Sequence, residues 1–371
     1  MANKGEWSEP YAALRIIGEG KIYIADENGN KNPMEWMSVL ELMRHETKER
    51  LVLYKLNSQN VDVDIYVNDE WKLSVQADRF LSMADTLSDE IRNGKGNSFD
   101  VSQDVSGFLQ NIELKHIKAS SVDKSDVFLS IRDPRAGVVR EHIGFSIKSD
   151  FGKDPTLFNT AKASGFIYEL DNMNDTLMKY INSLMDKKGH AAVQERCDKL
   201  LENHCNPTFV GLPIAKKAKC KAFEENLDLI NPRLVQVIEK ILSNHFFEHD
   251  AKTDLFSVTQ RVVEQNPCCL MRPEIKYEYM IKSFVYAAYC GMTASTLWSG
   301  DSQVNGGFIK VNSNGEVLAY YALESDAFKT YLYENCYLEF PSTDEKHGFY
   351  GNVYKENGKY YFRLNFQIRY K

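Results

Sequence analysis

Apolar and polar positions in the first half of the chain predict helices and strands in mixed order. Apolar residues at helical spacing predict helices over residues 5–18, 34–48, 76–93 and 105–117, with Pro10 near the first turn of the opening helix. Alternation predicts strands over residues 21–31 (with a turn), 50–56 and 61–69, and residues 125–149 have the pattern of a β-hairpin. We therefore expect a mixed central sheet flanked by helices.

The pattern changes near residue 190. Residues 157–170 predict a helix running into a strand, and residues 190–300 are mainly helical. Strands and hairpins follow from Asn305, including a final hairpin at Asn357–Gly358. Because 371 residues suit two ordinary domains, we expect an α+β (α/β) chain with domains 1–190 and 191–371.

Composition narrows the class of protein. The chain is 43% hydrophobic and 26% charged, without a membrane-length apolar run or a signal pattern, and its cysteine count of 7 is odd. These features favour a soluble protein of the reducing cytoplasm. The net charge of -7 does not exclude nucleic acid, because basic residues cluster locally at 114–120, 216–221 and 354–371. The last cluster interleaves lysine and arginine with aromatic residues.

The predicted hairpin carries the candidate chemistry. Residues two apart in a strand share a face, so Lys148 and Ser146 lie on one side and the apolar Ile147 on the other. Antiparallel pairing brings Asp126, at the start of the first strand, toward the end of the second. An acid, a hydroxyl and a lysine would then converge. The alternative is a surface hairpin with unrelated charges.

Metal-dependent phosphodiester hydrolysis needs such a set of groups. A carboxylate holds Mg²⁺, other oxygens complete the site, and a cation lies near the attacking water. The order Asp126, Ser146-Ile147-Lys148 resembles the PD-(D/E)xK nuclease signature, with serine at the usual place of the second acid. The Ile147 carbonyl is then a candidate metal ligand, and another acid must contribute.

The opening helix supplies that acid. Glu6 and Glu9 lie on neighbouring faces, and Lys4-Gly5-(x)3-Glu9 resembles the KGxxxE helix motif of related nucleases, which favours Glu9. Acids near the positive end of a helix dipole are the alternative explanation.

Five segments together are similar to HpaII-type restriction endonucleases. They are NKGEWSEPY (3–11), GEGKIYIADEN (18–28), GFSIKSDFGKDPTLFNTAKASGFIYEL (144–170), NGGFIKVNSNGEVLAYYA (305–322) and HGFYGNVYKENGKYYFRLNFQIRYK (347–371). Residues 190–270 add little to the likeness.

The resemblance implies a catalytic PD-(D/E)xK core with a helical segment and a C-terminal, β-rich DNA-recognition and dimerisation region. It also implies a Mg²⁺-dependent type II enzyme that cuts both strands of a palindrome, CCGG in the type member, with sensitivity to CpG methylation. A homodimer on double-stranded DNA would suit a palindrome, and a cognate methyltransferase would act on the same site without needing to bind the enzyme. Candidate DNA-contacting residues are Asn159, Asn305, Lys310, Arg363, Asn365, Gln367 and Arg369.

Three other interpretations remain open at this stage. His245, Glu248 and His249 fit the H-x-x-E-H pattern of inverted zinc peptidases, with Glu324 as a third ligand. The missing acid at Ser146 would also suit a sequence-specific DNA-binding protein that does not cleave. A nuclease specific for branched junctions would keep the chemistry and change the substrate.

Overall fold

The protein is described by a computed structural model. It covers residues 1–26, 28–57, 59, 61–120, 125–133, 137–152, 156–159, 161, 164–184, 190–212, 221–300, 306–321, 325–340 and 350–370. The chain forms two compact units, and each unit combines an early and a late segment. The first unit contains Met1–Pro155 and Ser302–Tyr331, and the second contains Thr156–Asp301 and Leu332–Lys371.

A nine-stranded mixed sheet forms the framework of the first unit. Its order is β1-β12-β11-β7-β6-β2-β3-β4-β5, and β1 also pairs with β2, so the six strands from β1 to β2 form a closed circuit. The strands are β1 (Lys21–Ala25), β2 (Lys31–Thr47), β3 (Arg50–Leu56), β4 (Asp62–Val67), β5 (Glu70–Gln76), β6 (Val127–Asp133), β7 (Val138–Ser149), β11 (Gly307–Val311) and β12 (Val317–Tyr321). The late strand β11 runs parallel to β7, whereas β6 and β7 are antiparallel.

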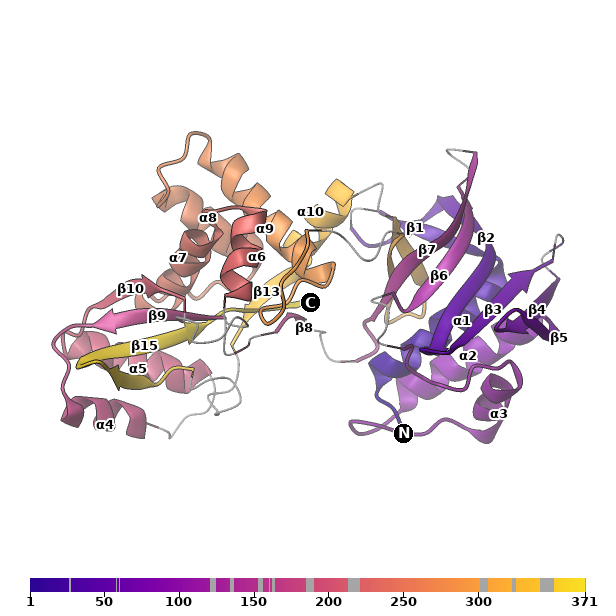
Figure 1. The fold of residues 1–371 in the computed structure, drawn as a ribbon, viewed down its shortest axis with the longest axis horizontal. Coiled ribbons are helices and arrows are strands. Elements are labelled where there is room, and N and C mark those ends of the chain that lie inside the picture. The colour runs from indigo at the N-terminus through magenta and orange to yellow at the C-terminus, as the bar shows by residue number, and fades with distance from the viewer. Residues whose placement is uncertain are drawn as a thin grey trace. The chain divides into compact units, whose positions relative to one another are not determined.

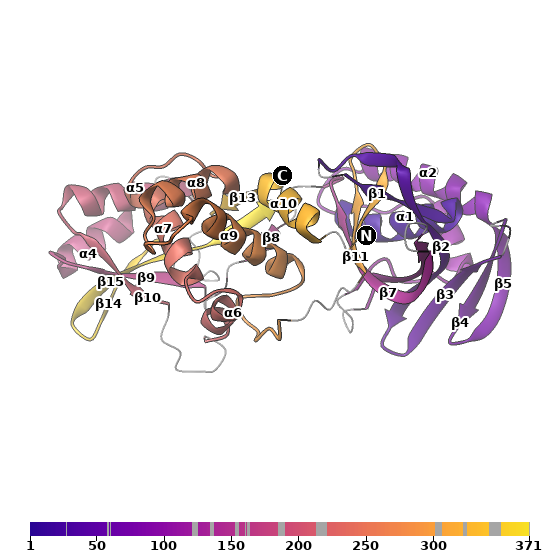
Figure 2. The same ribbon diagram turned by 90° about the horizontal axis from the view of Figure 1, so that it is seen from above.

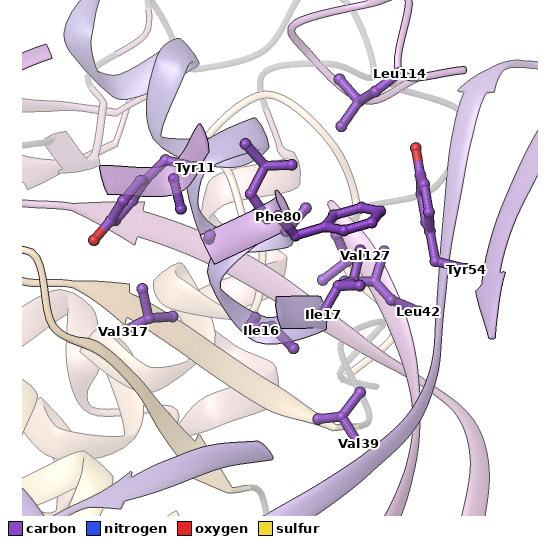
Figure 3. Packing of buried hydrophobic residues seen from close by; sticks show 14 of the residues in the cluster. Tyr11, Ile16, Ile17, Val39, Leu42, Tyr54, Phe80, Leu114, Val127 and Val317 are labelled. Atoms are coloured by element: carbon purple, nitrogen blue, oxygen red, sulfur yellow. The ribbon is translucent and has the colours of Figure 1, made fainter. Parts of the chain in front are cut away.

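Helices cover one face of this sheet and enclose the core (Figure 1). They are α1 (Lys4–Glu19), α2 (Ala77–Asn93) and α3 (Gln103–Asn111). Asn3 and Glu6 form a capping box at the start of α1, and Gly20 ends the helix in the left-handed conformation. In Figure 3, Ile17 of α1 and Phe80 of α2 lie close to Leu42 of the sheet. The Phe80 ring meets the Tyr54 ring edge to face, with centroids 6.3 Å apart.

The helix predicted over 34–48 is wrong, because this segment is the long strand β2. Its buried positions include Met37 and Val39, then Leu42 and Arg44, and the pairing with β6 shifts register between Val39 and Glu41. A bulge inserts one residue into the alternation, which turns a period of two into a spacing that resembles a helix face. Strong helix formers such as Met, Leu and Glu reinforce the false pattern.

The second unit contains two smaller sheets and most of the helices. The sheet orders are β10-β9-β15-β14 and β13-β16-β8. The strands are β8 (Thr156–Phe158), β9 (Gly165–Leu170), β10 (Pro207–Gly211), β13 (Cys336–Glu339), β14 (Val353–Glu356), β15 (Lys359–Asn365) and β16 (Gln367–Tyr370). The helices are α4 (Asp175–Ser183), α5 (His190–Glu202), α6 (Ala222–Ile230), α7 (Leu234–Phe247), α8 (Leu255–Gln265) and α9 (Pro273–Tyr289), and α7, α8 and α9 pack together (Figure 2). Helix α10 (Ser325–Asn335) begins in the first unit and ends in the second.

Several local predictions are confirmed. The β6–β7 hairpin, the helix over 76–93 and the hairpin at Asn357–Gly358 are present, and both turn residues of the last have positive φ, 50° and 80°. The predicted helix near Leu157 is wrong, because residues 156–158 form β8. Pro10 lies inside α1 and not in its first turn, yet the helix continues to Glu19.

The two units differ from the domains expected at residues 1–190 and 191–371. Strands β11 and β12 come late in the sequence but extend the sheet of the first unit beside β7. A pattern read along the chain cannot reveal such a return, because the pairing partner is far away in sequence. None of the helices in the described part of the chain has the length and apolar character needed to span a membrane.

Candidate active site

Asp126 and Ser146 meet at the end of the β6–β7 hairpin. Val127 lies opposite Phe145 in the antiparallel register, so the next pair along is Asp126 with Ser146. The Ser146 hydroxyl donates to Asp126 Oδ2 at 3.0 Å, and the backbone N–H of Ile147 donates to the same oxygen at 2.6 Å. These two bonds fix the carboxylate while leaving Asp126 Oδ1 without a hydrogen bond among the described residues.

Lys148 follows Ser146 by two positions and therefore lies on the same face of β7. Its side chain is exposed, whereas the flanking Ile147 and Ser149 are buried. A hollow of about 630 Å³ opens here, lined in part by Lys148, by Lys4 and Gly5 at the start of α1, and by Gly96 and Phe151. Lys148 thus lines a hollow large enough for a phosphodiester group, whereas Asp126, Ser146 and Glu9 are not among the residues that line it.

Glu9 of α1 contributes a second carboxylate. It is buried, 7% exposed, and its Oε2 accepts from Arg44 Nη2 at 3.2 Å and from the backbone N–H of Ala119 at 2.8 Å. Burial, followed by repulsion from Asp126, raises the pKa of Glu9 to about 7. Glu9 Oε1, like Asp126 Oδ1, accepts no hydrogen bond within the described part of the chain.

Helix α1 is attached to β7 by a buried hydroxyl pair. Ser8 Oγ donates to Ser149 Oγ at 2.6 Å, and both residues are buried. Ser8 precedes Glu9, and Ser149 follows Lys148. This contact therefore couples the position of the second carboxylate to the strand that carries the lysine.

The pair of carboxylates is suited to a hard divalent cation. In each carboxylate one oxygen accepts hydrogen bonds and the other accepts none from the described residues, and a cation between the two carboxylates would relieve their repulsion. Mg²⁺ keeps several waters and needs one or two carboxylates. Across the described residues, no group of three or more His, Cys, Asp or Glu side chains is arranged to hold a metal.

The other proposed ligands have different surroundings. The Glu6 carboxylate accepts from the backbone N–H of Asn3 at 3.0 Å, so it caps α1. Ile147 lies beside Asp126 through its N–H group. A ligand role for Glu6 or for the Ile147 carbonyl stays a prediction.

The residues expected to contact DNA are distributed over both units. Lys310 in β11 is in register with Lys148 and forms an ion pair with Asp150 at 3.0 Å. Asn159 is exposed just after β8 in the second unit. Asn305 lies outside the described residues.

The C-terminal residues do not share one strand. The chain passes from β15 to β16 at Phe366, and these strands belong to different sheets. Asn365 and Gln367 are buried, and Asn365 belongs to β15 whereas Gln367 and Arg369 belong to β16, so the three candidates do not line one strand edge. Arg363 donates to Asn365 Oδ1 at 3.1 Å, and Arg369 pairs with Glu339.

The zinc-peptidase pattern does not form the expected helix face. Helix α7 ends at Phe247, and His249 follows with a positive φ of 56°. His245 is buried against the Phe340 ring, whereas Glu248 pairs with Lys240 at 2.7 Å. The two histidines therefore do not lie one turn apart on a helix. Glu324 lies outside the described residues.

Comparison with known proteins identifies the family. A model of the HpaII restriction endonuclease family matches residues 3–370. The chain belongs to the HpaII restriction endonuclease family. The type II restriction enzyme HpaII of Haemophilus parainfluenzae is 32% identical over 371 residues, which cover 99% of this chain and 98% of that enzyme.

Membership in the HpaII family makes the chain a site-specific endonuclease of a restriction-modification system. The resemblance inferred from the sequence is thus confirmed. No solved structure gives a significant match.

Sequence reasoning missed two charged residues next to the candidate site. Arg44 and Glu46 are 0% and 3% exposed and alternate with Leu42 on the core side of β2. Charged groups on an apolar strand face are costly and mark a polar network. Recognition of residues 31–47 as a strand would have provided that signal.

Proposed function

We propose that this restriction endonuclease is a Mg²⁺-dependent enzyme that cuts both strands of a short palindrome, CCGG. Its products carry 5′-phosphate and 3′-hydroxyl ends. The first unit acts as a PD-(D/E)xK core. The chemistry takes place at Asp126, Ser146, Lys148 and Glu9. The cofactor, the DNA target and these residues are proposed in addition to the family membership that is already established.

One observation carries the proposal. The Asp126 carboxylate is fixed by Ser146 Oγ and by the Ile147 N–H, which both belong to the strand that carries Lys148. A second carboxylate, Glu9, is buried, and Asp126 contributes to its raised pKa. The serine does not replace the missing acid as a strong ligand. It orients Asp126, and Glu9 supplies the second negative charge from α1.

Each side chain then has a distinct task. Asp126 and Glu9 would hold the cation through Oδ1 and Oε1, which accept no hydrogen bond from the described residues. Lys148 lies toward the hollow, where its ammonium orients a water for in-line attack and offsets charge on the phosphate. When bound, Mg²⁺ supplies Lewis-acid polarisation of a phosphate oxygen and lowers the pKa of a coordinated water.

Recognition of a palindrome implies two active sites related by twofold symmetry, so we propose a homodimer on double-stranded DNA. The second unit supplies the recognition region in this proposal. Asn159 and Arg363 are candidates for DNA contact there, and Lys310 is the candidate in the first unit. We further propose that the enzyme works in the cytoplasm and that a cognate methyltransferase protects the same site without binding the enzyme.

Digestion of plasmid DNA with Mg²⁺, followed by sequencing of the fragment ends, tests the proposal. Discrete fragments ending within CCGG, with 5′-phosphates, are expected. A parallel digest of CpG-methylated plasmid reports methylation sensitivity. A gel shift with intact DNA would favour a non-cleaving binding protein, and cutting of four-way junctions in preference to linear duplex would favour a junction nuclease.

A further inference from the structure

Arg44 is a fully buried cation that joins three parts of the first unit. Its Nη1 donates to Glu46 Oε1 at 2.7 Å and to the His116 carbonyl at 2.6 Å. Its Nη2 donates to Glu9 Oε2 at 3.2 Å and to the Ile117 carbonyl at 2.6 Å. The side chain is 0% exposed. One guanidinium therefore ties α1 to β2 and to the chain segment that leads toward Asp126.

Glu46 extends this network on the side away from Glu9. Its Oε2 accepts from the backbone N–H groups of Lys115 and His116 at 2.9 and 2.6 Å, and it also lies 3.1 Å from the His116 ring Nδ1. The segment held in this way continues to Ala119, whose N–H group donates to Glu9. Both groups that hold Glu9 Oε2 thus belong to one connected network.

We propose that Arg44, supported by Glu46, is a positioning residue that holds the Glu9 carboxylate in place, so that Glu9 and Asp126 form a preassembled cation site. This inference rests on the proposed function. It assigns Arg44 no contact with DNA or with the cation.

Holding two like charges near each other has an energetic cost. Two carboxylates that repel one another would separate unless something holds them, and Glu9 is held by the buried opposite charge of Arg44 and by the Ala119 N–H group. Arginine suits the task because its planar fork serves four acceptors at once, whereas the lysine ammonium has three donors from one nitrogen. Partners that orient metal ligands typically change metal affinity or activity by about 10–100-fold when they are altered.

The test compares Arg44→Lys with the matched control Arg196→Lys. Arg196 of the second unit is also buried, 1% exposed, and also has four acceptors, which are three backbone carbonyls and the Asn352 amide oxygen. None of its acceptors is a carboxylate. The control therefore reports what any loss of a buried guanidinium does to the protein.

Two readouts are measured on the full chain. The first is binding of Mn²⁺ to the DNA-free protein by electron paramagnetic resonance, and the second is the Mg²⁺ concentration that gives half-maximal plasmid cutting. Arg44→Lys should weaken Mn²⁺ binding and raise the half-maximal Mg²⁺ by about 10-fold or more, with a smaller change in the rate at saturating Mg²⁺. Arg196→Lys should change neither by more than about twofold, although both variants lower the melting temperature.

A double-mutant cycle shows whether Arg44 acts through Glu9. Because the Glu9→Gln variant has already lost the charge that Arg44 holds, adding Arg44→Lys should weaken Mn²⁺ binding little further. A folded Arg44→Lys protein that binds Mn²⁺ like the wild type, or a double variant in which the two losses simply add, would overturn the inference.

If Arg44→Lys does not fold, Glu46→Gln decides the question. It retains Arg44 but weakens its support, so Mn²⁺ binding should fall several-fold, and unchanged binding would contradict the inference. Wild-type protein that neither binds Mn²⁺ nor cuts DNA would instead overturn the proposed function. The two failures are therefore distinguishable.

Discussion

The buried carboxyl group of Glu9 should make the stability of the metal-free protein depend on pH. Its pKa is raised to about 7 by burial and then by Asp126, against an ordinary value of 4.5. Between pH 4.5 and 7, the folded state therefore keeps a proton on Glu9 that the unfolded state has lost. Stability falls with rising pH wherever the folded state binds more protons than the unfolded state. The stabilising contribution of the protonated Glu9 carboxyl is therefore fully present below pH 4.5 and declines through pH 7.

The two pKa values determine the size of the effect. Their difference corresponds to a loss of about 3 kcal/mol in the free energy of unfolding once Glu9 is ionised. About 2.5 kcal/mol of this loss develops between pH 5 and 8. The Glu9→Gln variant removes this titration. The difference in unfolding free energy, wild type minus variant, should thus become more negative by about that amount from pH 5 to pH 8.

Urea denaturation in EDTA at several pH values measures this difference, because titrations shared by the two proteins cancel. Mg²⁺ should restore wild-type stability more at pH 8 than at pH 5, since the cation binds the ionised carboxylate. The variant should gain less. A difference that stays flat from pH 5 to pH 8 would refute the placement of Glu9 in a buried, repulsive environment.

Three further outcomes are expected. Asp126→Asn and Lys148→Ala should each reduce plasmid cutting at least about 1,000-fold, with binding in gel shifts nearly unchanged, and rapid cutting by either would mean that the centre lies elsewhere. Ser146→Ala removes one of two bonds to Asp126 and should slow cutting by about 10-fold at limiting Mg²⁺, with the slope of cutting rate against Mg²⁺ as the measurement. Phe80→Ala removes a fully buried ring and should cost about 3–5 kcal/mol in urea unfolding, so a loss below about 1 kcal/mol would contradict the core described in Figure 3.

Local patterns predicted the parts of the site that depend on one hairpin. Alternation placed Ser146 and Lys148 on one face, and the antiparallel return brought Asp126 to Ser146. The opening helix was also predicted, and the resemblance of its start to the KGxxxE motif pointed to Glu9. These features follow from neighbours along the chain and from the period of a strand.

Longer-range features could not be predicted in the same way. The bulge in β2 disguised a strand as a helix and concealed Arg44 on the core side. The pairing of β11 with β7 depends on tertiary contacts that no local pattern encodes. Burial of Gln367 and the break at Phe366 likewise depend on which sheet each strand joins.

The late arrival of β11 bears on how the enzyme is made in a cell. One edge of β7, the strand that carries Lys148, stays open until β11 is synthesised about 160 residues later, a delay of about 8–30 s at 5–20 residues per second on the ribosome. A nascent chain that stops before Gly307 lacks this neighbour and also lacks β12, which joins β11 to β1. The sheet that carries the proposed cutting residues is therefore completed only when most of the polypeptide exists, so aborted translation products should not threaten the chromosome of the producing cell.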